Sequence, residues 1–306
     1  MTRPVAAGVV LLILILVLYR TVGKISAREI AWLAGGRVPA GVEAEVYQAY
    51  LRRHNWGRLL GGALGVAVGV IVALRWGDDW SWTIQVGFGI PIHTNVLVWW
   101  LMGVTLGTLL TESYRLFARA APVVRRAVLD TRPVRPLPRI TWAARAVLGL
   151  AVLGGIAALA LRDDVAGAMA GSVLALLYVG LAEATQAAIT DRPRPVADPT
   201  ARVDGRLRWF AGTSVAWLEL AGAILGLTTV IGSWSTVWDQ PRLVGAVPIW
   251  APAVGALMTV LTLACVVVGI VAILRSRVHP PSGWHPPLGD GLSPGSGIVA
   301  ATGEAA

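Results

Sequence analysis

Seven long apolar stretches divide this sequence and constrain its fold more than any other feature. They occupy residues 5–22, 57–76, 94–112, 143–162, 165–185, 210–232 and 250–274. A helix needs about 20 mostly apolar residues to cross the hydrocarbon core of a bilayer. Only 14% of the 306 residues are charged, whereas a typical soluble domain has about 25%. We therefore predict an all-α, multi-pass transmembrane bundle of about seven spans within residues 1–277.

The two ends of the chain need separate interpretations. The first stretch could be a secretory signal peptide, but no small-residue cleavage site follows it at residues 19–24, so we expect an uncleaved helix. Residues 278–306 are rich in proline and glycine. This composition cannot bury enough apolar surface to fold alone, and we expect a disordered cytoplasmic tail.

The distribution of basic residues predicts the orientation of the chain. Of the 26 lysines and arginines, 22 fall in alternate connections and only four in the others. The positive-inside rule assigns the richer side to the cytoplasm, which leaves the N-terminus outside and the C-terminal tail inside. This topology also accounts for the net charge of +9, so we expect no nucleic-acid partner.

The near absence of lysine indicates the kind of genome that encodes this chain. Lys24 is the only lysine, so the other 25 basic residues are all arginine. Such a bias is typical of a high-GC bacterial genome, and a multi-pass bundle of this type would lie in the plasma membrane.

Glycines at four-residue spacing predict how the helices pack. Small residues at this spacing let two helix backbones approach closely in lipid. The helix-packing candidates are Gly61, Gly65, Gly69, Gly103, Gly107, Gly167, Gly171, Gly222 and Gly226. The same faces could instead mediate self-association or the docking of other membrane subunits.

Glu219 is the one acidic residue predicted to lie deep within a span. It follows Trp209 by ten residues, which places it roughly 15 Å along the helix. Its neighbours at three and four residues are mostly small, so we expect the carboxyl to point into the bundle. There it could carry a proton, a cation or a substrate, or it could be a protonated structural group bonded to Tyr178, Thr105 or Asn95.

Two arginine-proline runs lie in connections predicted to be cytoplasmic. Their candidate contact residues are Arg132, Arg135, Arg139, Arg192 and Arg194. Clustered arginines beside a membrane attract anionic headgroups, and a protein partner is the alternative. A further segment, Val42–Leu51, has the spacing of a short amphipathic surface helix.

Boundary residues recur in three successive helix pairs. Arginine and tryptophan open the pairs at residues 53–56, 139–142 and 206–209. One interpretation is a transporter-like repeat around a central site. The other is that arginine and tryptophan mark the membrane interface in any multi-pass protein.

The sequence lacks the enzyme motifs considered below, and three functions stay open. The surroundings of Lys24 exclude a nucleotide-binding Walker loop, and no zinc-protease motif is present, so we expect no cofactor and no metal. The favoured function is a non-enzymatic membrane component that packs with partner subunits. The alternatives are a proton-coupled transporter that uses Glu219 and a lipid-modifying enzyme that uses interfacial arginines with Glu112 and Glu183.

Overall fold

A computed structural model describes most of the chain between residues 25 and 284. It covers residues 25–39, 41–76, 83–86, 90–114, 137–161, 165–191, 200–238, 251–277, 280 and 283–284. The expected first span at residues 5–22, and most of the predicted tail, lie outside the described residues.

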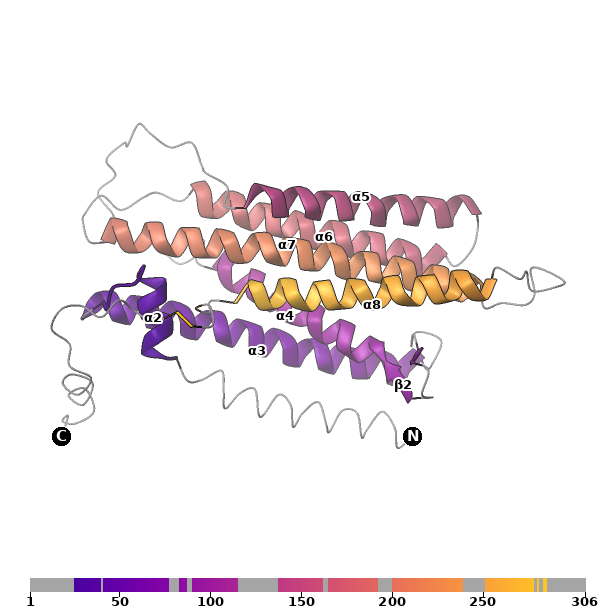
Figure 1. The fold of residues 1–306 in the computed structure, drawn as a ribbon, viewed down its shortest axis with the longest axis horizontal. Coiled ribbons are helices and arrows are strands. Elements are labelled where there is room, and N and C mark those ends of the chain that lie inside the picture. The colour runs from indigo at the N-terminus through magenta and orange to yellow at the C-terminus, as the bar shows by residue number, and fades with distance from the viewer. Residues whose placement is uncertain are drawn as a thin grey trace.

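Long helices running side by side dominate the described part of the chain (Figure 1). In chain order the elements are α2 (Ala27–Leu33), α3 (Val42–Trp76), β1 (Thr83–Val86), β2 (Ile90–His93), α4 (Thr94–Tyr114), α5 (Pro138–Leu161), α6 (Val165–Asp191), α7 (Thr200–Trp238) and α8 (Ala251–Arg275). The α3–α4 pair lies along one side of the group formed by α5, α6, α7 and α8.

Four of the described helices are long and apolar enough to cross a membrane. These segments are Pro138–Ala160, Gly167–Asp191, Val203–Trp234 and Ala253–Arg275. Helices α3 and α4 also cover the second and third expected spans, but α3 is more polar because its first half carries many charged residues. A membrane protein is therefore supported by four spans, while the count of seven and the orientation stay predictions.

A short antiparallel hairpin departs from the all-α expectation. Strand β1 pairs with β2, with Thr83 opposite His93 and Val86 opposite Ile90. Both strands contain β-branched residues, which favour extended backbone. The hairpin joins α3 to α4, where the sequence predicted only a connecting loop.

The segment Val42–Leu51 is not a separate surface helix, because it forms the first part of the 35-residue α3. Its aromatic side chains Tyr47 and Tyr50 are buried with Leu33 of α2 and Phe210 of α7. Helix α2 begins with a capping box between Ser26 and Glu29, which satisfies backbone donors at its start. This cluster therefore ties α2 and α3 to the first turns of α7.

Helices α3 and α4 pack backbone against backbone. A Cβ added to Gly61 would overlap the carbonyl oxygen of Gly103, and a Cβ added to Gly103 would overlap that of Gly61. A Cβ added to Gly107 would likewise overlap the carbonyl oxygen of Gly57, and a Cβ added to Gly65 would overlap that of Trp99. The two helices are thus antiparallel neighbours in a register that these glycines define.

Helices α6 and α7 also meet at glycines, against both side-chain and backbone atoms. A Cβ on Gly226 would lie 2.6 Å from the Cβ of Ala175, and one on Gly222 would overlap the Cβ of Tyr178. A Cβ on Gly171 would lie 2.8 Å from the carbonyl oxygen of Gly226. Of the other candidates, Gly69 is buried and Gly167 is half-buried.

Helix α7 occupies the centre of the described bundle, in contact with α4, α5, α6 and α8. Its apolar window is 78% buried, whereas that of α5 is 22% buried. If the three helix pairs were equivalent repeats, α5 and α7, which begin the second and third pairs, would be buried to the same extent. The unequal burial of α5 and α7 therefore favours the simpler interpretation, in which arginine and tryptophan mark boundaries.

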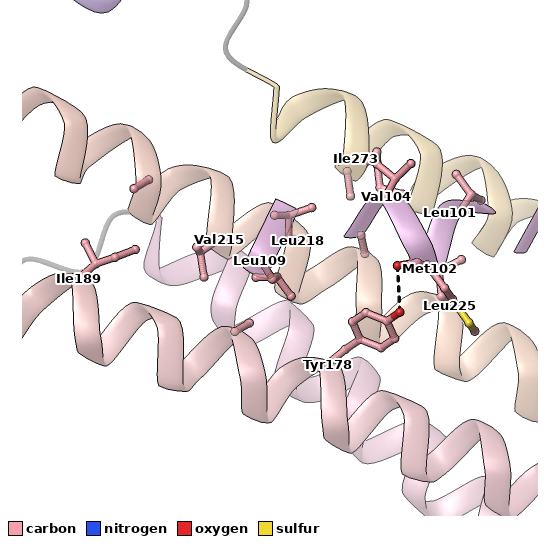
Figure 2. Packing of buried hydrophobic residues seen from close by; sticks show 14 residues of the cluster. Leu101, Met102, Val104, Leu109, Tyr178, Ile189, Val215, Leu218, Leu225 and Ile273 are labelled. Atoms are coloured by element: carbon pink, nitrogen blue, oxygen red, sulfur yellow. Dashed lines mark hydrogen bonds between the residues drawn. The ribbon is translucent and has the colours of Figure 1, made fainter. Parts of the chain in front are cut away.

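A buried cluster joins α4 and α6 to α7 (Figure 2). The hydroxyl of Tyr178 donates a hydrogen bond of 2.9 Å to the carbonyl oxygen of Met102. Leu109 and Leu218 are fully buried in the same cluster. Because Met102 lies on α4, this contact fixes the α3–α4 pair against the other helices.

Candidate functional site

A buried polar cluster links α3 and α4 where α3 enters the bundle. The carboxyl oxygen Oε1 of Glu112 accepts a hydrogen bond of 3.0 Å from the Tyr50 hydroxyl. The same oxygen lies 3.0 Å from Nδ1 of His54. Tyr50 and His54 are one helical turn apart on α3, and their rings stack at 6.0 Å. Two side chains of α3 therefore share one buried carboxyl oxygen of α4.

The register of the glycines positions this cluster. Gly57 and Gly107 bring α3 and α4 into backbone contact, and His54 and Glu112 lie within five residues of them on the same two helices. Glu112 and His54 are only 2% and 0% exposed. Buried polar groups need partners because desolvation is costly. The pairing of Glu112 with Tyr50 and His54 provides them beside the backbone contact between α3 and α4.

One nitrogen of His54 stays outside this network. Its Nε2 atom is buried and has no hydrogen-bond partner among the described residues. An imidazole held by a carboxylate through Nδ1 is the arrangement that fixes a histidine tautomer. The Glu112 carboxyl therefore fixes the orientation of the His54 ring.

Glu219 is a second buried acidic side chain among the described residues. Glu219 lies near the middle of α7 and is 2% exposed. On the neighbouring helices, Nε of Arg145 donates a hydrogen bond of 3.1 Å to Oε1 of Glu183. The carboxyl of Glu219 also contributes to the electrostatic field at Arg145. The acidic residue in α7 is thus accompanied by an ion pair between α5 and α6.

The hydroxyls expected as partners of Glu219 bond elsewhere. Tyr178 donates to the backbone carbonyl of Met102, and Thr105 donates to that of Leu101 at 2.9 Å. The side chain of Asn95 lies outside the described residues. Of these three candidates, the two that the structure describes stabilise helix backbones.

Glu112 and Glu183, the acids proposed for an interfacial enzyme, lie in different clusters. Glu112 faces Tyr50 and His54 of α3, whereas Glu183 faces Arg145 of α5. Paired-carboxylate chemistry needs both acids at one reacting centre. The described arrangement does not bring them to one.

The arginine-proline runs are mostly outside the described residues. Arg132, Arg135, Arg192 and Arg194 lie there, and Arg139 is exposed in the first turn of α5. The described residues contain no group of three or more histidine, cysteine or acidic side chains arranged to hold a metal ion.

Sequence reasoning missed Tyr50 and His54 as site residues. Their four-residue spacing on one helix was visible, as was the position of Glu112 at the end of a predicted span. Their partnership was not, because Glu112 lies 58 residues from His54 in the chain. Only the pairing of α3 with α4 brings these groups together.

No protein-family model matches this chain, and comparisons with curated proteins and with solved structures find no similar protein.

Proposed function

We propose that this chain is a non-enzymatic plasma-membrane component that packs against another transmembrane helix. The main support is the exposed face of α6. It is made of Val173, Leu177, Gly180, Ala184 and Ala187, which follow one another at three- or four-residue intervals and so share one side of the helix.

This α6 face combines apolar and small residues without cover from the described chain. Leu177 is 63% exposed, and a Cβ added to Gly180 would meet nothing within 4 Å. Gly180 and Ala184 repeat the small-residue spacing that brings α3 and α4 together. The face therefore supports contact with a helix from a second copy or from a different subunit.

The pairing of the acidic side chains agrees with a packing role. Glu112 bonds to Tyr50 and His54, and Glu183 bonds to Arg145. Groups bonded in this way join helices to one another, which suits a component whose task is to hold a fixed shape in the membrane.

Thiol cross-linking in native membranes tests the proposal. Ala184→Cys would be introduced with Cys265→Ser, since Cys265 is the only native cysteine. A reagent with one thiol-reactive end and one photoreactive end should give an adduct at twice the 32.2 kDa chain mass for a second copy, or at another mass for a different subunit. Adding Gly180→Leu should abolish the adduct.

Gly149→Leu is the matched control, because Gly149 lies on α5 with nothing within 4 Å of an added Cβ. It should leave the adduct unchanged. An adduct that survives Gly180→Leu, or no adduct at all, would contradict helix packing at this face.

Proton-coupled transport through Glu219 is the second candidate. The burial of Glu219 in the middle of α7 favours it, because intramembrane acids commonly mark ion pathways. Glu219→Gln and Glu219→Leu would be compared by complementation of a deletion strain. If transport uses this carboxyl, both should fail, whereas full complementation by both excludes it.

A further inference from the structure

A groove between α3, α4 and α8 has an apolar wall and a basic end. Its volume is about 160 Å³. Leu59, Trp100, Val104 and Ile270 contribute to the wall, and Arg58 lies at the end of the groove. These residues come from three helices, so the groove exists only in the assembled bundle.

Two arginines meet at the basic end without a carboxylate. Arg58 and Arg277 both line the groove and are close enough for their charges to repel each other. Arg58 donates hydrogen bonds of 2.9 Å to the Ser276 hydroxyl and to the carbonyl oxygen of Ile273. These acceptors are neutral, and neither arginine forms an ion pair with an acid in the described part of the chain. An anion at this end would relieve the repulsion.

The positions of the arginines correspond to the headgroup layer. Arg58 falls in the first turn of the expected span 57–76, and Arg277 lies two residues beyond the end of α8. Both mark the boundary that the positive-inside rule assigns to the cytoplasm. The leaflet on that side carries the anionic lipids, and basic pockets between transmembrane helices there bind their headgroups.

The apolar wall extends from this boundary into the depth of the membrane. Ile270 precedes Arg277 by seven residues, a distance of about 10 Å along a helix. Leu274, one turn from Ile270, also lines the groove and is 58% exposed. A molecule with a negative head and an apolar chain fits this arrangement, whereas a free inorganic anion would leave the wall unused.

We propose that the groove between α3, α4 and α8 binds an anionic phospholipid, with its phosphate between Arg58 and Arg277 and an acyl chain along Trp100 and Ile270. The lipid would then fill the seam where α8 meets the α3–α4 pair. This site is separate from the α6 face and does not depend on the function proposed for that face.

Native mass spectrometry of the full chain in detergent tests the site. The protein would be titrated with phosphatidylglycerol and with phosphatidylcholine of the same chain length. Arg277→Gln should weaken phosphatidylglycerol binding about fivefold, the ratio that corresponds to ~1 kcal/mol per arginine near a membrane surface. Arg277→Lys should keep most of the binding because it retains the charge.

Arg275→Gln is the matched control, since Arg275 is exposed in the last turn of α8 and does not line the groove. It should change binding by less than about twofold, because the charge lost lies outside the site. Equal losses for Arg275→Gln and Arg277→Gln would show diffuse attraction and overturn the proposal.

Ile270→Trp separates a lipid from a free anion. It narrows the apolar wall and leaves the charge intact, so it should weaken phosphatidylglycerol binding. Unchanged binding in this variant, or displacement of the lipid by millimolar inorganic phosphate, would indicate an anion site without an acyl chain and would also overturn the proposal.

Discussion

The α3–α4 and α6–α7 pairs both pack through glycines at four-residue spacing, yet different atoms lie opposite those glycines. In α3–α4, Gly61 and Gly103 each face the other's backbone carbonyl. In α6–α7, Gly222 faces the side chain of Tyr178, while Gly226 faces the Cβ of Ala175 together with backbone atoms of Ala175 and Gly171. The same sequence spacing thus produces a backbone contact in one pair, and a contact shared between side chains and backbone in the other.

The two pairs also differ in how they use polar groups. The α3–α4 contact ends at the carboxyl of Glu112, which Tyr50 and His54 share. The α6–α7 contact lies beside Tyr178, whose hydroxyl bonds outward to α4. The α3–α4 pair is therefore held by its own polar cluster, while α6 and α7 are linked to the remainder of the bundle.

Gly61→Ala should have the largest effect, because no side-chain movement can make room for the added methyl group. We expect a loss of about 3 kcal/mol in the free energy of unfolding, at the upper end of the range for overpacking. Denaturant unfolding in detergent micelles would measure it. Gly149→Ala, at an open position on α5, should be neutral or stabilising by up to about 1 kcal/mol. Equal values for the two variants would mean that α3 and α4 do not touch as described.

Glu112→Leu should have the next largest effect. It removes the acceptor shared by Tyr50 and His54 and so breaks two buried hydrogen bonds at once, which costs about 2–3 kcal/mol. Tyr50→Phe breaks one of these two bonds and should cost about 1 kcal/mol. The same unfolding assay would compare them. A cost for Glu112→Leu no larger than that for Tyr50→Phe would show that the cluster does not hold the pair together.

Gly226→Ala should have the smallest effect of the three, about 1–2 kcal/mol, because the nearest atom is the Cβ of Ala175 at 2.6 Å. The amide nitrogen of Ala175 and the carbonyl oxygen of Gly171 both lie 2.8 Å from the added methyl group. Adding Ala175→Gly removes the Cβ but not these backbone atoms, so it should recover only part of the lost stability. No side-chain change offers even this partial rescue at Gly61, and absence of any recovery at Gly226 would mean that the two pairs do not differ in this respect.

Several elements of the fold followed from local sequence. The helices α5 to α8 form where apolar stretches were predicted, and α3 and α4 cover two more. The four-residue glycine spacing identified residues that lie at helix contacts, among them Gly61 and Gly226. These features depend on short-range pattern, so they can be seen without knowing which helix lies next to which.

Other features could not be predicted in this way. The segment Val42–Leu51 was predicted as a separate surface helix, but it is the first part of α3. Its aromatic residues Tyr47 and Tyr50 are covered by α2 and α7, and this cover is not visible in the local sequence. The hairpin of β1 and β2 was expected as a loop because four-residue strands carry little pattern. The groove lined by Arg58 and Arg277 combines residues 219 positions apart.

The sequence by itself determined which helices are apolar enough to cross a membrane, because the transfer of an apolar helix into lipid depends mainly on its own composition. Tertiary structure decided which helix is central and which polar groups meet. Helices α7 and α8 are both apolar, yet the window of α7 is 78% buried and that of α8 is 28% buried. In lipid an apolar surface is equally stable against a bilayer or a neighbouring helix, so close packing and hydrogen bonding select the neighbours.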